Sequence, residues 1–451
     1  MDEQETESGR TLSGAVYDVV GIGFGPANLA LAIAIDEHNR SVEPAGQVSY
    51  VFVEKQTKFG WHKGMLIEDA QMQISFLKDL VTLRNPVSDL SFVSFLADND
   101  RLVDFTNHQR LFPSRLEFHR YLEWASARIA GDVRYGSLVT DVRPVVEDGD
   151  VVALDVVATT EDGSGTDAVF RGRNVVVATG LTPSMPAAMS ESDRIWHNGQ
   201  LMDRLSSETV RSASKFMVVG AGQSAAETVE CLHRRFPEAE VHSVFSRFGF
   251  SPADDSPFAN GIFDPATVPV FFNAPAEIKE MLLDYHRNTN YSVVDTDLIR
   301  SLYASHYQEK VSGQRRLHLL NMSKVTAVLP GYDSVQVEVQ YLPSGDVTSV
   351  DVDVLVYATG YRPADPLRVL GQAAELCKCD SENRLRTELN YRVATAANVR
   401  CGIYVQGPTE HSHGLASSLL SNVAVRAGDI LSSLLAERVS SESLEAFSSH
   451  G

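Results

Sequence analysis

The sequence of 451 residues predicts an α/β fold that contains two units of the same kind, joined by a smaller region. Two glycine-rich turns predict this duplication, GIGFGP at 21–26 and GAGQSA at 220–225. An apolar β run precedes each turn and a helical pattern follows it, which is the opening of a βαβ unit. Two further β runs, at 174–180 and 353–361, contain the same Ala-Thr-Gly triplet. A chain of this length exceeds a single hydrophobic core, so we expect two or three domains.

Composition and charge place the chain among soluble globular proteins and exclude one class of partner. It has 43% hydrophobic and 22% charged residues, which is near the globular average. Its formal net charge of −20 would repel a polyphosphate backbone, so we expect no nucleic-acid partner. Small anionic cofactors remain compatible with this charge, because local backbone N–H groups and a few cations hold them.

The cysteines and the amino terminus predict a cytoplasmic protein. Four cysteines in a chain of this length do not make a disulfide framework. The first residues, MDEQETESGRTLSGA, lack the basic and apolar regions of a signal peptide. No apolar run approaches the roughly 20 residues that cross a bilayer, so no membrane partner is expected. We also expect no metal site, because the histidines of HSH at 411–413 have no matching ligand cluster.

The first glycine-rich turn fits a dinucleotide site. In such a turn the first glycine permits a tight bend, the second admits the pyrophosphate, and a third small residue lets helix pack on strand. Gly21, Gly23 and Pro26 fit these positions, since proline is tolerated in a first helical turn. The next strand, at 49–55, carries Glu54 near its end, where an acid binds ribose hydroxyls. The alternative is a glycine turn without a ligand, which the strand and helix around it disfavour.

The second turn has the same context but a different charge after its second strand. A buried strand at 215–219 leads into Gly220, Gly222 and Ala225, and the next strand ends at Arg247. An acid at that place favours an unphosphorylated ribose, whereas a cation suits a 2′-phosphate. We therefore predict FAD at the first site and NADPH at the second. Hydride transfer to a flavin needs both nucleotides at one point, so the two sites predict a redox enzyme.

One region in the middle of the chain differs in composition from the two dinucleotide-binding units. The region at about 248–312 is rich in aromatic residues, Asn, Asp and Pro, which indicates an insertion with loops. A disulfide reductase is disfavoured, because Cys377 and Cys379 do not have the Cys-x-x-Cys spacing.

Several blocks along the chain resemble one family. They are, in order, VVGIGFGPANLALA, WHKGMLIEDAQMQISFLKDLVTLRNP, FVSFL, VVGAGQSAAE, DDSPFANGIFDP, HRNTNYSVVD, ATGY and HGLASSLLSNVAVRAG. Together, from about 16 to 430, they resemble the flavin-dependent N-hydroxylating monooxygenases, in particular the L-ornithine N5-monooxygenases of siderophore biosynthesis. The resemblance implies two Rossmann-like dinucleotide-binding domains, for FAD and NADPH, with a smaller substrate-binding region and with the FAD domain built from both ends of the chain. Between a mobile tail at 1–13 and another at 437–451, the resemblance implies the first part of an FAD-binding domain at 14–200, an NADPH-binding domain at 201–355 with a substrate-binding insertion at about 248–312, and a return to the FAD domain and substrate site at 356–436. It also implies a reaction in which NADPH reduces FAD, O2 forms a C4a-hydroperoxyflavin, and the side-chain amine of L-ornithine attacks it to give N5-hydroxyornithine.

The resemblance also implies roles for individual residues. Lys78 matches a lysine that binds the substrate carboxylate, and Ser421 matches a serine near the reacting amine. Asn260 and Asn290 match asparagines that hold the α-amino and carboxylate end of the substrate. The implied catalytic residues are Gln73, Asn290 and Ser421, and the implied substrate-binding residues are Lys78, Asn260, Phe263, Asn290 and Ser421. The implied FAD contacts are Gly21, Gly23, Gly25, Pro26, Glu54, Trp61, His62, Met72, Gln73, Val139, Leu415, Ser418, Leu419 and Leu420. The implied NADP contacts are Gly220, Gly222, Gln223, Ser224, Arg247, Asn290 and Thr359.

Two positions depart from the family pattern or align poorly with it. The loop SRFGFSPADD around Arg247 does not align cleanly, and Ala416 stands where many relatives have serine. We call the implied substrate-binding set of Lys78, Asn260 and Asn290 the clamp. It is chemically reasonable, because a fixed lysine beside two amides neutralises a carboxylate and sets how far the terminal amine of the substrate reaches. Taken singly, Lys78 would be a surface charge and each asparagine a turn cap.

Several alternatives stay open at the level of sequence. L-lysine is one methylene longer than L-ornithine, and one methylene is worth only ~1–3 kcal/mol of discrimination. Diamines lack the carboxylate that Lys78 is expected to bind. A protein of another class, a sensor that binds FAD and NADP(H) without turnover, would need no amino-acid clamp. The family resemblance implies a homo-oligomer, often a tetramer.

Overall fold

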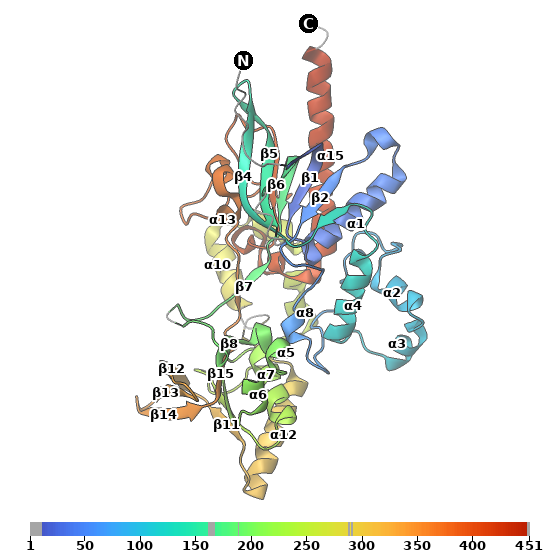
Figure 1. Ribbon diagram of the computed structural model, residues 1–451. Coiled ribbons are helices and arrows are strands. Elements are labelled where there is room, and N and C mark those ends of the chain that lie inside the picture. Colours follow the sequence, from blue (N-terminus) through green and yellow to red (C-terminus); the bar gives the residue numbers. More distant parts are fainter. Residues whose placement is uncertain (1–10, 161–166, 188, 287–288, 290–291, 449–451) are drawn as a thin grey trace.

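The computed structural model has two lobes, one above the other in Figure 1. It describes residues 11–160, 167–187, 189–286, 289 and 292–448. We call the upper one, which contains both ends of the described chain, the first lobe, and the lower one the second lobe.

The first lobe is built on a seven-stranded sheet in the order β3-β2-β1-β6-β5-β4, with β17 also paired to β6. Its strands are β1 (Thr11–Ile22), β2 (Tyr50–Val53), β3 (Asp132–Arg134), β4 (Ser137–Glu147), β5 (Asp150–Thr160), β6 (Asp167–Val177) and β17 (Gly402–Val405). The strands nearest the first glycine turn are parallel, whereas β4, β5 and β6 pair antiparallel. Helices α1 (Pro26–Ser41) and α15 (Val423–Ser448) pack together beside the sheet, and their apolar faces join one core with Phe52.

Three helices flank this lobe: α2 (Phe92–Asp98), α3 (Leu102–His108) and α4 (Arg115–Ser126). Aromatic rings hold them together, with Phe92 stacked on Phe118 at 5.9 Å between centroids. Such pairs add about 0.5–1.5 kcal/mol beyond the area that they bury. These ring contacts fix α4 on the side of the first lobe.

The second lobe has a five-stranded parallel sheet in the order β11-β10-β9-β15-β8. The strands are β8 (Ile195–His197), β9 (Lys215–Val219), β10 (Glu240–Val244), β11 (Leu317–Leu320) and β15 (Val354–Tyr357). Helices α5 (Leu201–Arg204), α6 (Glu208–Arg211), α7 (Gln223–Arg235) and α12 (Thr296–Ser312) belong to this lobe. A second, antiparallel sheet of β12 (Ser323–Pro330), β13 (Val335–Tyr341) and β14 (Val347–Val352) packs its Val337 against Met217 and Leu355.

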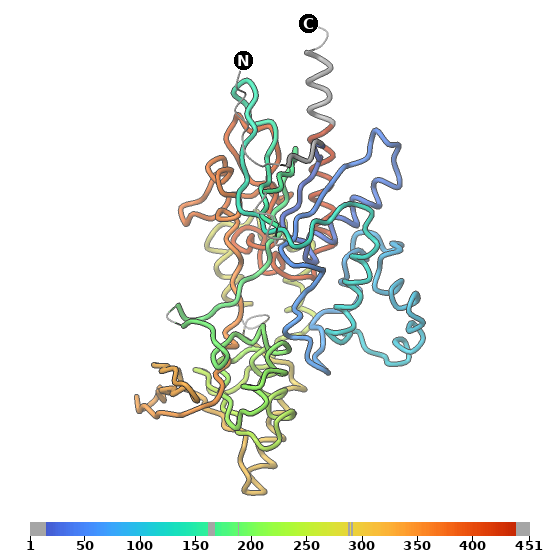
Figure 2. The backbone as a smooth tube through the Cα atoms, in the orientation of Figure 1, coloured from blue at the N-terminus to red at the C-terminus, as the bar shows by residue number. Residues whose placement is uncertain are grey.

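The two lobes are joined by a two-stranded ribbon. Strands β7 (Leu181–Pro183) and β16 (Tyr361–Pro363) pair antiparallel, and Figure 2 shows the two segments running between the lobes. The second lobe is therefore inserted between β6 and β17 of the first. Its sheet begins at β8 and ends at Tyr357, so it extends beyond the predicted limits of 201–355 at both ends.

The described part of the region at 248–312 is mostly helical, with loops between the helices, whereas its composition predicted an insertion with loops and no helices were expected from it. It contains α8 (Pro257–Asn260), α9 (Thr267–Asn273), α10 (Ala276–Tyr285) and α12. The polar and proline residues that suggested loops lie at helix starts: Ser256 caps α8, Pro257 occupies its first turn, and Asp295 precedes α12. Helix α12 packs on α7 and leads into β11, so it is a crossover helix of the second lobe. Helix α9 packs instead on α14 (Glu410–His413), which belongs to the return segment.

The remaining elements are short, and the ends of the chain differ from the expectation. They are α13 (Pro366–Leu370) and the 3-10 helices η1 (Pro44–Gly46), η2 (Lys63–Met65), η3 (Asn198–Gln200), η4 (Gly261–Phe263), η5 (Gly371–Leu376), η6 (Leu415–Ser418) and η7 (Leu420–Asn422). Strand β1 begins inside the predicted tail of 1–13, and helix α15 continues to Ser448 where a mobile tail was predicted from 437.

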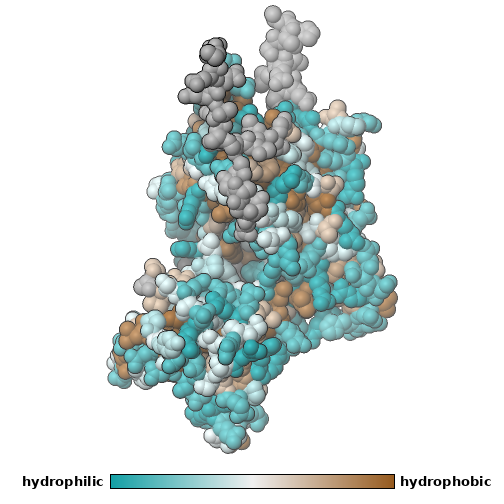
Figure 3. Space-filling model, viewed as in Figure 1, coloured by the Kyte–Doolittle hydropathy of each residue, from teal (hydrophilic) through white to brown (hydrophobic). Residues whose placement is uncertain are grey.

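The surface is mainly hydrophilic on the face shown in Figure 3, with apolar residues in scattered groups. Among the described residues, no helix has the length and apolar character that crossing a bilayer requires.

Candidate functional site

A large cavity, of about 2440 Å³, lies where the two lobes meet. Residues of both glycine-rich turns line it, as do residues of the ribbon, of the 248–312 region and of the return segment. Pockets for one small molecule are typically ~300–1,000 Å³. This cavity therefore has room for two dinucleotides and a small substrate at once.

The two glycine turns are held in place by the two Ala-Thr-Gly triplets. Gly23 has a φ of +84°, and a Cβ there would lie 2.5 Å from the carbonyl oxygen of Ala178. Gly220 has a φ of +151°, and a Cβ there would overlap the carbonyl oxygen of Ala358. Each turn thus needs both the backbone freedom and the absent side chain of glycine. Ala178 follows β6 and Ala358 follows β15, and the small side chain of each leaves room for the neighbouring glycine turn.

Both helices that follow these turns begin at the cavity wall. Helix α1 starts after Gly25 and helix α7 after Gly222, and no side chain among the described residues caps either start. Neither helix has an acidic residue in its first turn. Their first-turn backbone N–H groups and the positive end of the helix dipole therefore suit an anionic group such as a pyrophosphate.

The ends of the second strands carry opposite charges, as predicted. The buried carboxylate of Glu54 accepts hydrogen bonds from the backbone N–H of Phe24 at 2.7 Å and of Gln56 at 2.8 Å. Arg247 is half-buried and donates to the backbone oxygen of Ser292 at 2.7 Å. Both side chains line the cavity.

Most residues that the resemblance singles out line this cavity. From the FAD set, the cavity-lining residues are Gly23, Gly25, Pro26, Glu54, Trp61, His62, Met72, Gln73, Val139, Ser418, Leu419 and Leu420. From the NADP set they are Gly220, Gly222, Gln223, Ser224, Arg247 and Thr359. From the substrate set they are Lys78, Asn260, Phe263 and Ser421.

Two described residues of the predicted sets are not among those lining the cavity, and one predicted residue lies outside the described part of the chain. Gly21 lies against Phe52, whose ring a Cβ would overlap, so it serves the packing of β1 on β2. Leu415 is buried in an apolar cluster with Phe263 and Ala416. Asn290 lies outside the described residues.

Lys78 stands on a turn that a buried aspartate holds. The carboxylate of Asp79 accepts hydrogen bonds from the backbone N–H groups of Val81, Thr82 and Phe92 and from the Thr82 hydroxyl. Burial raises the pKa of Asp79, and these hydrogen bonds oppose the rise. The half-buried Lys78 is thus placed beside the cavity on a fixed backbone.

The other substrate-set residues come from the 248–312 region and the return segment. Asn260 ends helix α8, and its side-chain amide donates to the backbone oxygen of Asp255 at 2.8 Å. Phe263 packs against Leu415 and Ala416, and Ser421 is buried in η7. The cavity thereby gains an apolar wall next to polar groups.

The sequence analysis missed an ion pair that connects the lobes. Arg115, at the start of α4, donates two hydrogen bonds to the carboxylate of Glu227 on α7, at 2.9 and 2.8 Å. It also donates to the backbone oxygen of Met65 at 2.8 Å. Both side chains are largely buried, with 13% and 6% exposed. No sequence signal marks this pair, because its members lie on different predicted domains.

A second missed residue, Asp295, connects two residues predicted to contact different nucleotides. Its carboxylate accepts from the side-chain amides of Gln73 at 3.1 Å and Gln223 at 2.8 Å. Its backbone N–H donates to the side-chain oxygen of Gln223 at 2.8 Å. Burial raises the pKa of Asp295. The amides of Gln73 and Gln223 are therefore positioned by one carboxylate.

Two further features of the cavity region concern charge and redox chemistry. Arg426 is buried and lines the cavity, and it donates to Gln406 at 3.2 Å and to the backbone oxygen of Ser417. Burial lowers the pKa of Arg426.

Burial raises the pKa of Cys377 to about 12, so its thiol is not activated. A thiolate nucleophile at Cys377 is accordingly disfavoured.

Two Rossmann-like lobes that share one cavity define an oxidoreductase with two dinucleotide-binding domains. The model of the L-lysine 6-monooxygenase/L-ornithine 5-monooxygenase family matches residues 15–363. The chain belongs to this family.

Individual relatives agree with that assignment. An L-ornithine N(5)-monooxygenase of Pseudomonas aeruginosa is 36% identical over 429 residues, covering 94% of this chain and 95% of that protein. An ornithine N-hydroxylase of Kutzneria sp. 744, solved with reduced FAD, NADP+ and L-ornithine, superposes with a TM-score of 0.89 and is 45% identical, covering 94% of this chain and 100% of that one. An L-lysine 6-monooxygenase of Pseudomonas syringae has a TM-score of 0.82 and 32% identity, covering 93% of this chain and 99% of that one.

Proposed function

We propose that this protein is a flavin-dependent monooxygenase that uses NADPH and O2 to hydroxylate the side-chain amine of L-ornithine. The product serves the biosynthesis of a siderophore or a related natural product. The observation that carries this proposal is the single cavity, which both glycine turns line together with Lys78, Asn260 and Ser421. A sensor of FAD and NADP(H) would not need the last three residues.

The residues of the first lobe fit FAD. The uncapped start of α1 suits the pyrophosphate, and Glu54 suits the ribose hydroxyls. The residues of the second lobe fit NADPH in the same way, with Gly222 at the start of α7 and Arg247 for a 2′-phosphate. When bound, the flavin supplies the ring that NADPH reduces and on which O2 is activated.

The chain's own residues bind and orient the amino acid. Lys78 binds the carboxylate, and Asn260 holds the same end of the substrate by hydrogen bonds. The apolar wall that includes Phe263 excludes water and lowers the pKa of the substrate's terminal amine, which must be neutral to act as a nucleophile. Ser421 lies near that amine and accepts or donates a hydrogen bond.

L-Ornithine is favoured over L-lysine by the relatives. The two ornithine enzymes reported above are 36% and 45% identical to this chain, and the lysine enzyme is 32% identical. Because one methylene separates the two amino acids, the distance from Lys78 to the reacting centre decides between them.

The test is a hydroxylamine assay with L-ornithine, L-lysine, putrescine and cadaverine, with product measured against NADPH consumed. We expect coupled product formation with L-ornithine and little with the diamines. NADPH oxidation without hydroxylamine from any of the four would support the sensor or a plain oxidase instead.

A matched pair of variants tests the clamp. Lys78→Ala should raise the KM for L-ornithine about 10- to 100-fold, since a hydrogen bond to a charged group is worth ~1.5–3 kcal/mol. Flavin reduction by NADPH should stay unchanged in this variant. Lys58→Ala, an exposed lysine outside the cavity lining, is the control. An unchanged KM in Lys78→Ala would remove Lys78 from the clamp.

Several predictions of the resemblance concern roles of single residues: catalysis by Gln73, Asn290 and Ser421, and a substrate or nucleotide contact for Asn290. The cytoplasmic location and the homotetramer are also predictions. Size measurement of the holoenzyme in solution tests the assembly, and single alanine variants in the hydroxylamine assay test the three side chains.

A further inference from the structure

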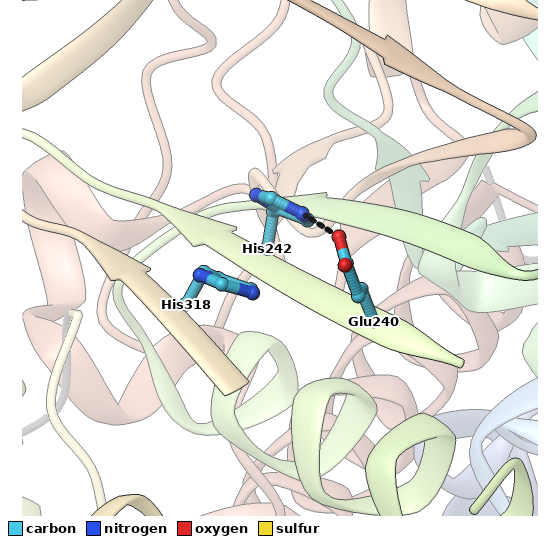
Figure 4. Close-up of side chains that lie close together, drawn as sticks. All are labelled: Glu240, His242 and His318. Atoms are coloured by element: carbon cyan, nitrogen blue, oxygen red, sulfur yellow. Dashed lines mark hydrogen bonds and ion pairs between the residues drawn. The ribbon is translucent and has the colours of Figure 1, made fainter. Parts of the chain in front are cut away.

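A cluster of two histidines and a glutamate lies in the second lobe, outside the cavity. Glu240 and His242 are on β10, and His318 is on β11, which is the edge strand of the five-stranded sheet. The parallel register pairs His242 directly with His318. Residues two apart on a strand point to the same face, so all three side chains lie on one face, as Figure 4 shows. None of the three lines the cavity between the lobes.

The cluster brings three candidate ligand side chains close together on one face of the sheet. The imidazole rings are stacked, with 4.5 Å between centroids and 13° between planes. The Nε2 atom of His242 lies 3.2 Å from a carboxylate oxygen of Glu240. The ligand atoms of all three residues lie within 4.8 Å of one another. Small rotations of the side chains would bring them around one ion.

One atom of the cluster lacks a partner. The Nε2 atom of His318 is buried, and no hydrogen-bond partner for it exists among the described residues. A buried polar atom without a partner costs about 1–3 kcal/mol, so such atoms indicate a missing ligand or function. The Nε2 atom of His242, in contrast, has the carboxylate of Glu240 as its partner.

We propose that Glu240, His242 and His318 bind a divalent transition-metal ion of the zinc class, with water in a fourth position. Imidazole nitrogens with one carboxylate oxygen form a ligand set that Zn²⁺ uses in proteins, and imidazole also suits Cu²⁺ and Ni²⁺. Hard ions such as Mg²⁺ and Ca²⁺ prefer oxygen ligands and are excluded by the two imidazoles. The side chain of Glu240 is 41% exposed, so an ion reaches the cluster from solvent.

Lys215 competes with the ion for the same carboxylate. Its ammonium lies 3.3 Å from a carboxylate oxygen of Glu240, and 35% of its side chain is exposed. A divalent ion bound to Glu240 would repel this ammonium, which can move into solvent. Removing the ammonium should therefore strengthen metal binding, whereas removing any of the three ligands should weaken it.

The proposed ion joins the edge strand β11 to its neighbour β10. Because a ligand that binds only the folded state stabilises it by mass action, the ion should stabilise the second lobe. The sequence predicted no metal site, because the histidines of HSH at 411–413 have no matching ligands near them. His242 and His318 are far apart in the chain, and only strand pairing brings them together.

The experiment uses the FAD-loaded holoenzyme, treated with a chelator, dialysed, and then titrated with Zn²⁺ in a calorimeter. We expect one equivalent of Zn²⁺ to bind. His242→Gln, His318→Gln and Glu240→Gln should each weaken binding more than about 10-fold, since even loss of an outer-shell partner costs that much. Lys215→Ala should bind Zn²⁺ more tightly than the parent. FAD content and NADPH oxidation of each variant establish that it is folded.

The control is His411→Gln, which alters the HSH tract instead of the cluster. This variant should bind Zn²⁺ like the parent. The proposal is overturned if the parent binds no Zn²⁺, if His318→Gln binds it unchanged, or if His411→Gln alone loses it. Because Glu240 is partly exposed, Glu240→Gln keeps the test decisive even where a histidine variant fails to fold.

Discussion

The first and second lobes use the same contact to shape their glycine turns and different residues to choose their nucleotides. In one lobe Gly23 lies against the carbonyl of Ala178, and in the other Gly220 lies against that of Ala358. After the next strand the lobes diverge, with a buried Glu54 in one and a half-buried Arg247 in the other. In the proposed assignment, the shared turn decides where a nucleotide lies, and the charged residue after the second strand decides which nucleotide it is.

The largest expected effect comes from filling the two turns. Gly23→Val places a branched side chain at a positive φ and against Ala178, so the holoenzyme should lose FAD. Gly220→Val should keep FAD and lose NADPH-dependent flavin reduction. Bound flavin by absorbance and stopped-flow reduction by NADPH measure the two outcomes.

Gly249→Ala provides the control for these variants, because a Cβ at Gly249 meets no atom within 4 Å and Gly249 is not among the residues that line the cavity. Loss of FAD in both valine variants, with the second lobe still folded, would contradict the division of the two nucleotides between the lobes.

The next effect concerns what holds the lobes together. Glu227→Ala leaves the largely buried charge of Arg115 uncompensated, which typically costs about 3–5 kcal/mol. We expect a lower free energy of unfolding and a separation of the two lobes' unfolding transitions in urea. Tryptophan fluorescence and flavin release monitor them. Glu238→Ala, an exposed glutamate next to the same sheet, is the control, and equal losses in both variants would exclude a special role for the ion pair.

A smaller effect tests the charge that distinguishes the second lobe. Arg247→Ala should lower the ratio of kcat/KM for NADPH to that for NADH about 10- to 100-fold, because a hydrogen bond to a charged group is worth ~1.5–3 kcal/mol. Lys324 lines the cavity and is exposed, so Lys324→Ala should lower the ratio less. Arg247→Lys should restore part of the preference. An unchanged ratio in Arg247→Ala would assign the 2′-phosphate to another cation.

The smallest effect concerns acid stability of the first lobe. His413 is 1% exposed, stacks on Tyr391 at 4.1 Å, and its Nδ1 and Nε2 each have a hydrogen-bond partner. Burial lowers its pKa from 6.5 to about 4. Between these values the unfolded chain binds the proton more readily than the folded chain does. This histidine therefore makes stability fall as pH falls, by up to ~1.4 kcal/mol per pH unit.

His413→Gln should flatten that dependence between pH 6.5 and 4, with flavin release in urea at each pH as the measurement. The exposed His108→Gln is the control. If the slopes of the parent and of His413→Gln coincide, protonation of His413 does not govern the acid stability of the first lobe.

Features encoded locally in the sequence could be predicted. The two glycine turns, the strands before them and the charges of Glu54 and Arg247 all follow from short stretches with a known periodicity. The family and the α/β fold are confirmed by the comparisons. Within one strand or one turn, neighbours in sequence are neighbours in space, so pattern and structure agree.

Features that depend on distant residues could not be predicted. Arg115 and Glu227 meet only after the lobes pack, and Asp295 joins Gln73 to Gln223 across the same boundary.

The helices of the region at 248–312 could not be predicted for a different reason. Its serine, aspartate and proline residues occur both in loops and at helix starts, and composition does not separate the two uses.

The nested order of the chain governs when the first lobe can be completed during synthesis. Strand β17 pairs with the second half of β6, and Gly402 donates to the side chain of Asn174, a residue 228 positions earlier. Until the ribosome has released β17 and α15, that edge of β6 and the apolar side of α1 have no covering. The second lobe is synthesised whole before then, and contacts of such long sequence separation form slowly. On the ribosome the second lobe is therefore complete while the edge of β6 in the first lobe still lacks its partner strand.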